Sequence, residues 1–96
     1  MKPLCLTKEL ERVARRCVWF KEPRDAVADP VRLIAYVLTY GTADDVKESL
    51  RHVTDVDLEE AIDQAPSGVF DARSWAYWNL MLGRYETPPL PVRRFE

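Results

Sequence analysis

The residues that could act as nucleophiles, bases or metal ligands are few and scattered. His52 is the only histidine of the chain, and Cys5 and Cys17 are its only cysteines. A metal site needs three or four ligands at characteristic spacings, which these residues do not supply. No nucleophile motif surrounds His52, so the sequence favours a surface histidine near a helix C-terminus over a catalytic Ser–His or Cys–His pair.

Paired carboxylates are the second group that could do chemistry. The pairs are Asp44 with Asp45, Asp55 with Asp57, and Glu59 with Glu60. The helix dipole favours acids in a first turn, so the pattern indicates solvated helix starts rather than a general acid and base. The three glycines, at 41, 68 and 83, are too far apart for a phosphate-binding loop. We therefore expect no enzyme, no cofactor and no metal.

Four cations gather on one side of a helix predicted over about residues 8 to 18. Its buried face is predicted from helical spacing to contain Leu10, Val13, Ala14, Cys17 and Val18. The opposite face carries Lys8, Arg12, Arg15 and Arg16. These four are the candidate nucleic-acid-binding residues of an alternative function, a regulator that binds nucleic acid through its basic first helix. The net charge of −2 makes nucleic acid the less favoured partner.

A second candidate surface is a helix predicted over about residues 72 to 82, which is apolar or aromatic almost all round. A helix predicted over about residues 30 to 40 has the same character, and the other helices can enclose it. A small domain normally shelters one such helix, so we expect the last one to expose apolar side chains to a partner. The predicted partner-binding residues are Trp75, Tyr77, Trp78, Met81 and Tyr85.

The C-terminal segment offers an alternative cover for that helix. Pro88, Pro89 and Pro91 predict an extended, Pro-rich tail over residues 87–96, after a helical domain at 1–86. The tail could fold back through Tyr85, Leu90 and Phe95 and bury the last helix, and this alternative stays open. The proline spacing followed by Arg93 also resembles a ligand for SH3-type grooves, on weaker grounds.

Capping residues delimit the elements that position these side chains. Helix starts are predicted at Thr7, Asp29, Thr42, Thr54 and Asp71, which give helices over about residues 8–18, 30–40, 43–52, 55–65 and 72–82. Gly41 is predicted to end one of them in the left-handed conformation, and Gly83 is predicted to end the last helix. No segment alternates with period two. The predicted fold class is all-α, a single small bundle of about five short helices with an extended C-terminal tail.

The length and amino-acid composition are typical of one small domain that folds in water. The chain has 96 residues, of which 47% are apolar and 31% charged. It shows no apolar run of about 20 residues, which a membrane span needs, and no signal-like apolar core near Met1. Two cysteines are fewer than disulfide-dependent secreted domains carry. We therefore expect reduced thiols, a cytoplasmic location and no membrane association.

Several segments resemble a known family. They are Val18-Trp-Phe-Lys, Ala28-Asp-Pro-Val, Phe70-Asp-Ala-Arg-Ser-Trp-Ala-Tyr-Trp-Asn-Leu and Gly83-Arg-Tyr. Over about residues 10 to 95 the chain resembles a family of small uncharacterised bacterial proteins often encoded beside an abortive-infection-type nucleotidyltransferase toxin. The resemblance implies the small partner of a two-gene system, in an antitoxin-like role, and it implies no catalytic residue.

The function predicted from the sequence is therefore a non-enzymatic protein–protein interaction module. Its partner is expected to be another protein, and the resemblance implies a nucleotidyltransferase-type toxin. Self-association as a homodimer stays open.

Overall fold

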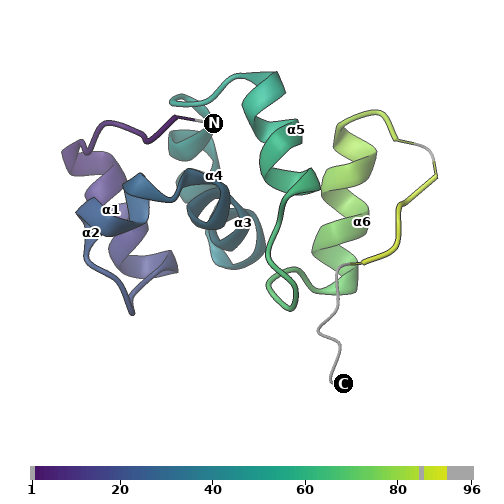
Figure 1. The fold of residues 1–96 in the computed structure, drawn as a ribbon, viewed down its shortest axis with the longest axis horizontal. Helices are drawn as coiled ribbons and strands as arrows, with labels where there is room; N and C mark the ends of the chain where they lie inside the picture. The colour runs from purple at the N-terminus through teal and green to yellow at the C-terminus, as the bar shows by residue number, and fades with distance from the viewer. Residues whose placement is uncertain (1, 85, 91–96) are drawn as a thin grey trace.

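The computed structural model describes residues 2–84 and 86–90. This part of the chain contains six α-helices and no strand (Figure 1). The helices are α1 (Lys8–Cys17), α2 (Pro23–Ala28), α3 (Pro30–Tyr40), α4 (Ala43–Leu50), α5 (Asp55–Asp63) and α6 (Ala72–Met81). The predicted all-α class is confirmed, with six helices in place of the expected five.

The additional helix is α2, which begins at Pro23. The expectation that the first helix ends before Pro23 is confirmed, because α1 ends at Cys17. Proline also fits the first position of a new helix, where its missing N–H leaves no hydrogen bond unmade. Ala26 and Val27 of α2 are buried in the core. A helix of six residues is too short to show a periodic pattern, which is why the sequence did not predict it.

The predicted caps are confirmed at four of the five helix starts. Thr42 and Thr54 form reciprocal capping boxes with Asp45 and Asp57, and Thr7 and Asp71 each accept a backbone N–H. Asp29 is the exception, because its side chain makes no capping hydrogen bond. Its carboxylate lies 3.5 Å from Arg32 Nε and 3.9 Å from Lys21 Nζ instead.

The two glycines that end helices do so for different reasons. Gly83 follows the end of α6, as predicted, and has φ +79°, the left-handed conformation that favours glycine. Gly41 does not, since its φ is −73°, and the prediction for it was wrong. A Cβ atom at Gly41 would lie 2.6 Å from the carbonyl oxygen of Val37. Close approach of the backbone, rather than left-handed geometry, is what requires glycine there.

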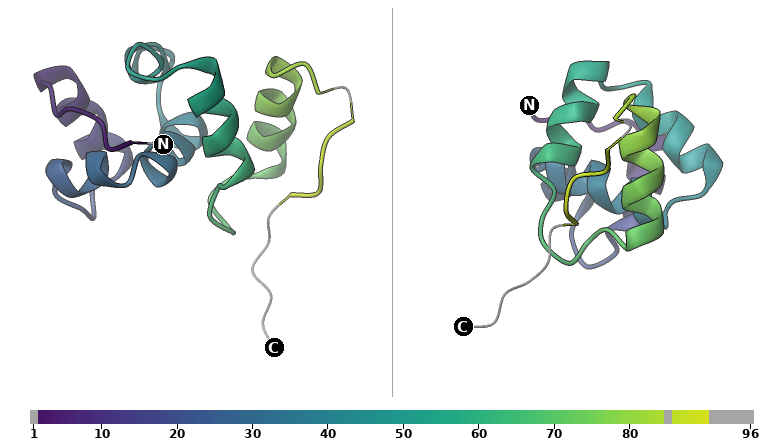
Figure 2. Two further views of the ribbon diagram at one scale, coloured as in Figure 1. Left: turned by 45° about the horizontal axis from the view of Figure 1, so that its top comes forward. Right: turned by 90° about the vertical axis from the view of Figure 1, so that its right-hand side faces the viewer.

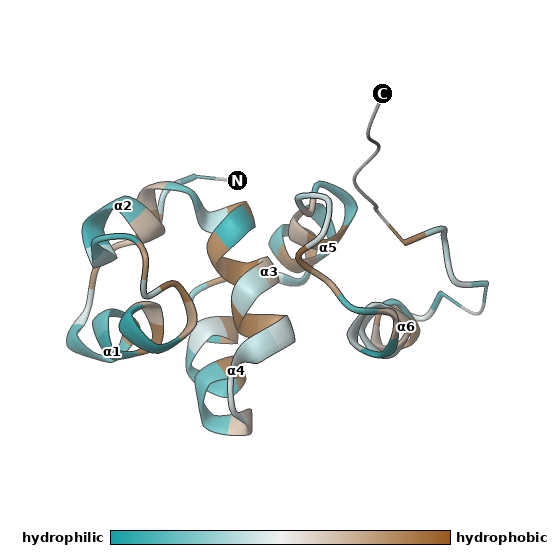
Figure 3. Ribbon diagram, turned by 90° about the horizontal axis from the view of Figure 1, so that it is seen from below, coloured by the Kyte–Doolittle hydropathy of each residue, from teal (hydrophilic) through white to brown (hydrophobic). Residues whose placement is uncertain are grey.

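Helix α3 lies at the centre and is contacted by each of the other five helices in the described chain. On one side it packs against α1 and α2, and on the other against α5 and α6 (Figure 3). The buried apolar side chains form two clusters, which we call the first and the second half-core. Leu33 and Val37 of α3 belong to the first, which includes residues of α1 and α2. Ile34, Ala35 and Leu38 belong to the second, which includes residues of α5 and α6. One helix therefore supplies apolar side chains to two separate clusters.

Helix α6 stands at one end of the molecule (Figure 2). Two tryptophans tie it to the rest of the chain through their indole N–H groups. Trp75 is only 5% exposed and packs edge-to-face on Phe70, with ring centroids 5.4 Å apart. Its indole N–H donates to the Pro88 carbonyl at 2.8 Å, and the indole N–H of Trp78 donates to the Leu38 carbonyl at 3.1 Å. The segment that ends at Leu90 therefore folds back beside α6, in agreement with that part of the alternative given for the tail. The other two residues of that alternative, Tyr85 and Phe95, lie outside the described residues.

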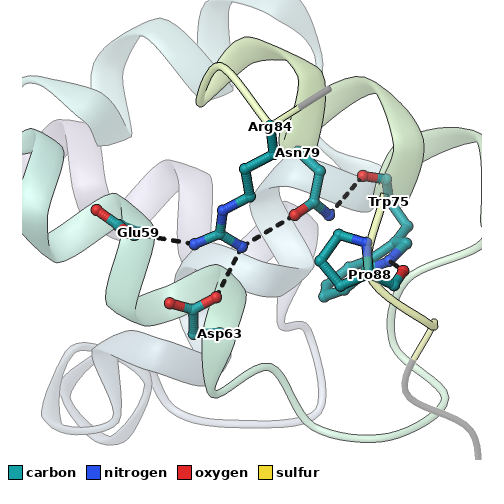
Figure 4. A network of polar contacts seen from close by, with 6 residues as sticks. All are labelled: Glu59, Asp63, Trp75, Asn79, Arg84 and Pro88. Carbon is teal, nitrogen blue, oxygen red and sulfur yellow. Dashed lines mark hydrogen bonds and ion pairs between the residues drawn. The ribbon is translucent and has the colours of Figure 1, made fainter. Parts of the chain in front are cut away.

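A polar network fixes the C-terminal end of α6 to α5 (Figure 4). The fully buried Asn79 donates to the Trp75 carbonyl at 2.9 Å and accepts from Arg84 Nη1 at 3.0 Å. The guanidinium of Arg84 also lies 2.7 Å from Asp63 and 3.3 Å from Glu59. Its hydrogen bond to Asp63 raises the pKa of Arg84. Asn79 thus joins the helix to the turn that follows it.

We expect Asn79→Ala to lower the free energy of unfolding by about 2 kcal/mol, because it removes one buried and one partly buried hydrogen bond and leaves the Trp75 carbonyl without its side-chain donor. Urea unfolding monitored by circular dichroism measures the change. Met81→Ala, an exposed position on the same helix, serves as the control and should change stability by less than about 0.5 kcal/mol. Equal stability of the two variants would show that the network does not hold α6.

Candidate interaction surfaces

The outer face of α6 carries three adjacent apolar side chains. Tyr77, Leu80 and Met81 are 52%, 59% and 61% exposed. They stand at positions i, i+3 and i+4, so they lie together on one face of the helix. We call these three residues the α6 outer face.

The predicted partner-binding residues divide between the two sides of this helix. Tyr77 and Met81 are exposed on the α6 outer face, whereas Trp75 is buried and Trp78 is half-buried. Tyr85 lies outside the described residues. Leu80 belongs to the exposed face and was absent from the predicted set, although its spacing from Tyr77 and Met81 could have indicated it.

A depression of about 450 Å³ runs beside this face, between α6 and the turn from α3 to α4. Its lining consists of Leu38, Gly41, Ala43, Val46, Arg73, Ser74, Tyr77 and Trp78. The rings of Tyr77 and Trp78 meet edge-to-face, with centroids 5.1 Å apart. Tyr77 therefore belongs to both the depression and the α6 outer face.

A second apolar surface was not predicted. The side chains of Trp19, Phe20, Tyr36 and Tyr40 form a continuous row, with successive ring centroids 5.6, 5.4 and 5.8 Å apart. Trp19 is 78% exposed, and Phe20 and Tyr40 are also exposed. We call this set the aromatic row. The prediction that the other helices enclose α3 was therefore wrong along the arc of Tyr36 and Tyr40.

Two depressions adjoin the aromatic row. The first, of about 330 Å³, is lined by Arg16, Cys17, Trp19, Phe20, Tyr36 and Tyr40. The second, of about 670 Å³, is lined by Arg15, Trp19, Phe20, Lys21, Glu22 and Asp25. The two share Trp19 and Phe20, and each has an arginine of α1 at its edge.

The four predicted nucleic-acid-binding cations are all exposed on α1, as the helical spacing indicated. Arg15 lies 3.0 Å from Glu11, and Arg16 donates a hydrogen bond to Asp45. Lys8 and Arg12 form no ion pair with another described residue. The two arginines nearest the aromatic row thus already have carboxylate partners.

One member of the carboxylate pair Asp44 and Asp45 has a structural role. Asp45 is buried, accepts from the backbone N–H of Thr42 at 3.0 Å and lies 4.0 Å from the Sγ atom of Cys17. Burial, followed by the charge of Asp45, raises the pKa of Cys17 to about 11. Asp45 therefore joins α1 to α4 and caps α4, whereas its neighbour Asp44 is exposed.

Cys5 and His52, which are far apart in the sequence, line one depression of about 660 Å³ together with Asp57. The Nε2 atom of His52 lies 3.2 Å from Glu48. In the described ranges, no group of three or more His, Cys, Asp or Glu side chains is arranged to hold a metal ion. Cys5 is exposed and Cys17 is buried, and both are free thiols.

Comparison of the chain with protein-family models, with curated proteins and with solved structures finds no match. None of the helices in the described ranges has the length and apolar character that crossing a membrane requires. What the protein does must therefore be inferred from the surfaces themselves.

We expect Cys5 to react rapidly with a disulfide reagent such as DTNB at pH 8, and Cys17 to react only after unfolding in guanidinium chloride. With a pKa of about 11, about one Cys17 side chain in a thousand is ionised at pH 8, and the core also shields it. The yield of released thiolate, followed by absorbance, measures both groups. Cys5→Ser should abolish the rapid reaction, and two rapidly reacting thiols in the folded protein would contradict the expectation.

Proposed function

We propose that this chain is a non-enzymatic protein-interaction module that binds a protein partner through the α6 outer face. The observation that carries the proposal is the exposure of Tyr77, Leu80 and Met81, each more than half open to solvent on adjacent turns of one helix. Single exposed apolar residues are ordinary on soluble proteins, whereas contiguous ones mark interfaces. Aromatic residues and methionine are also enriched in such contacts.

The way α6 is held supports this role. Trp75 and Trp78 anchor its inner side, and Asn79 with Arg84 fixes its end. The outer side chains are therefore presented on a helix that is already formed and positioned. A preformed surface loses less conformational entropy on binding than a segment that must fold first.

The resemblance of the sequence points to the class of partner, a nucleotidyltransferase-type toxin that an antitoxin-like chain would mask. Exposed carboxylates such as Asp44 on α4 and Asp55 on α5 would complement a basic, nucleotide-binding surface. Such complementarity mainly accelerates encounter and selects the partner. The apolar face of α6 would then supply most of the affinity.

The double variant Leu80→Gln/Met81→Gln should weaken binding of the adjacent gene's product about a hundredfold, because it removes two apolar contacts at the centre of the interface. Isothermal titration calorimetry with the two purified proteins measures the affinity. Glutamine forms helices well, so α6 should persist, and circular dichroism checks that it does.

Val56→Gln is the matched control, since Val56 is a 75% exposed apolar residue on a different helix, α5. It should bind as the unaltered chain does. Equal weakening by the control and the double variant would refute a specific role for α6. Light scattering of the chain alone tests the other occupant of this face, and a stable homodimer disrupted by the double variant would replace the heteromeric partner with a second copy.

A further inference from the structure

The aromatic row continues a line of cations on α1. Lys8 and Arg12 lie along the exposed side of the helix, and Arg15 and Arg16 stand at its C-terminal end. The chain then turns directly into Trp19 and Phe20, and the row extends over α3 to Tyr40. Cations and exposed rings therefore adjoin one another on α1, on the turn after it and on the neighbouring side of α3. Helix α1 lies at the end of the molecule opposite α6, and α3 lies between them (Figures 1 and 3).

The two kinds of side chain define the chemistry of a ligand. Exposed rings offer flat apolar faces, on which a planar group can stack. Arg15 and Lys21 in the lining of one depression, and Arg16 in that of the other, offer donors and charge to an anion. Glu22 and Asp25 line the first depression as well, and Lys21 Nζ lies 3.9 Å from Asp29. A ligand that fits must therefore repeat planar groups and anionic groups a few ångströms apart.

We propose that the aromatic row and the adjoining cations of α1 bind single-stranded nucleic acid. Bases stack on Trp19 and on its neighbours in the row, and phosphates lie against Arg15, Arg16 and Lys21. Single strands expose the faces of their bases, and proteins that bind them combine aromatic stacking with a basic track for the backbone. A duplex hides those faces, so it would leave the aromatic row unused.

The nearby carboxylates limit the strength of this site without removing it. Arg15 pairs with Glu11 in an exposed contact, which contributes little and can be exchanged for a phosphate. Arg16 also bonds to Asp45, but its side chain remains 60% exposed. Lys8 and Arg12 have no carboxylate partner among the described residues. Residues 1–24 carry seven basic and three acidic groups, whereas the whole chain has a net charge of −2. Glu22 and Asp25, which line the depression beside Trp19, lower the positive charge at the site itself.

This site is independent of the proposed function. It uses α1, the turn after it and α3, whereas the protein partner is proposed to bind α6. Either surface can therefore fail its test without affecting the other.

Fluorescence anisotropy with labelled twelve-nucleotide oligothymidylate and oligouridylate tests the proposal, using the full chain at 50 mM salt. We expect saturable binding of at least one oligonucleotide, about tenfold weaker for Trp19→Ala, since loss of one stacked base has an effect of this order. Trp19→Phe should restore most of the affinity because it keeps a stacking face. The preferred oligonucleotide shows whether the ligand is DNA or RNA.

Charge is tested separately. Arg15→Gln should weaken binding about threefold, and the logarithm of the association constant should fall with the logarithm of salt concentration with a slope of about −2, as expected for about three phosphates on a single strand. Val56→Ala is the control, since Val56 is a 75% exposed apolar residue on α5, outside both proposed surfaces, and this variant should bind within about twofold of the unaltered chain.

Three results would overturn the proposal. They are no saturable binding of either oligonucleotide at 50 mM salt, equal binding by Trp19→Ala and the unaltered chain, and tighter binding of a twelve-base-pair duplex than of either single strand. Trp19 is largely exposed, so the variant is expected to stay folded, and circular dichroism confirms that loss of binding is not loss of structure.

Discussion

The arrangement of this molecule depends on one constraint, the sharing of helix α3 between two half-cores. Leu33 and Val37 pack toward α1 and α2, while Ile34 and Leu38 pack toward α5 and α6. A helix that is apolar around most of its circumference is stable only when neighbours remove most of that surface from water. The other five helices leave Tyr40 exposed and Tyr36 half-buried. The aromatic row is the consequence, and its position follows from how α3 is shared.

Helix α6 is likewise only partly buried by its neighbours. This helix packs on α3 along one side only, where Trp75 and Trp78 provide both apolar contact and indole donors. The returning segment adds Leu90 to the second half-core and accepts a hydrogen bond at Pro88. The remaining side has no further segment among the described residues to bury it. The tryptophans thus act as anchors, and the smaller apolar residues face solvent.

Sequence patterns predicted the elements with local signals and missed those that depend on packing. The capping boxes at Thr42 and Thr54 need only residues three positions apart, so both starts were predictable. Helix α2 shows no periodicity in six residues and forms because Ala26 and Val27 fill space between α1 and α3. On α6, where nearly every position is apolar, the pattern could not show which side faces α3, and Trp75 was therefore placed on the wrong side.

The missed aromatic row has a related cause. Trp19 and Phe20 lie in a turn, where no period reveals a face, and Tyr36 contacts Phe20 only because α1 and α3 pack side by side. Net charge is a sum over 96 residues and does not report local charge, as the seven basic and three acidic groups of residues 1–24 show. Binding depends on the local field and on the groups within a Debye length, about 8 Å in physiological salt. Beside the aromatic row the charges are mixed, because Arg15 and Lys21 line the same depression as Glu22 and Asp25. The site proposed for a single strand therefore depends mainly on its exposed rings.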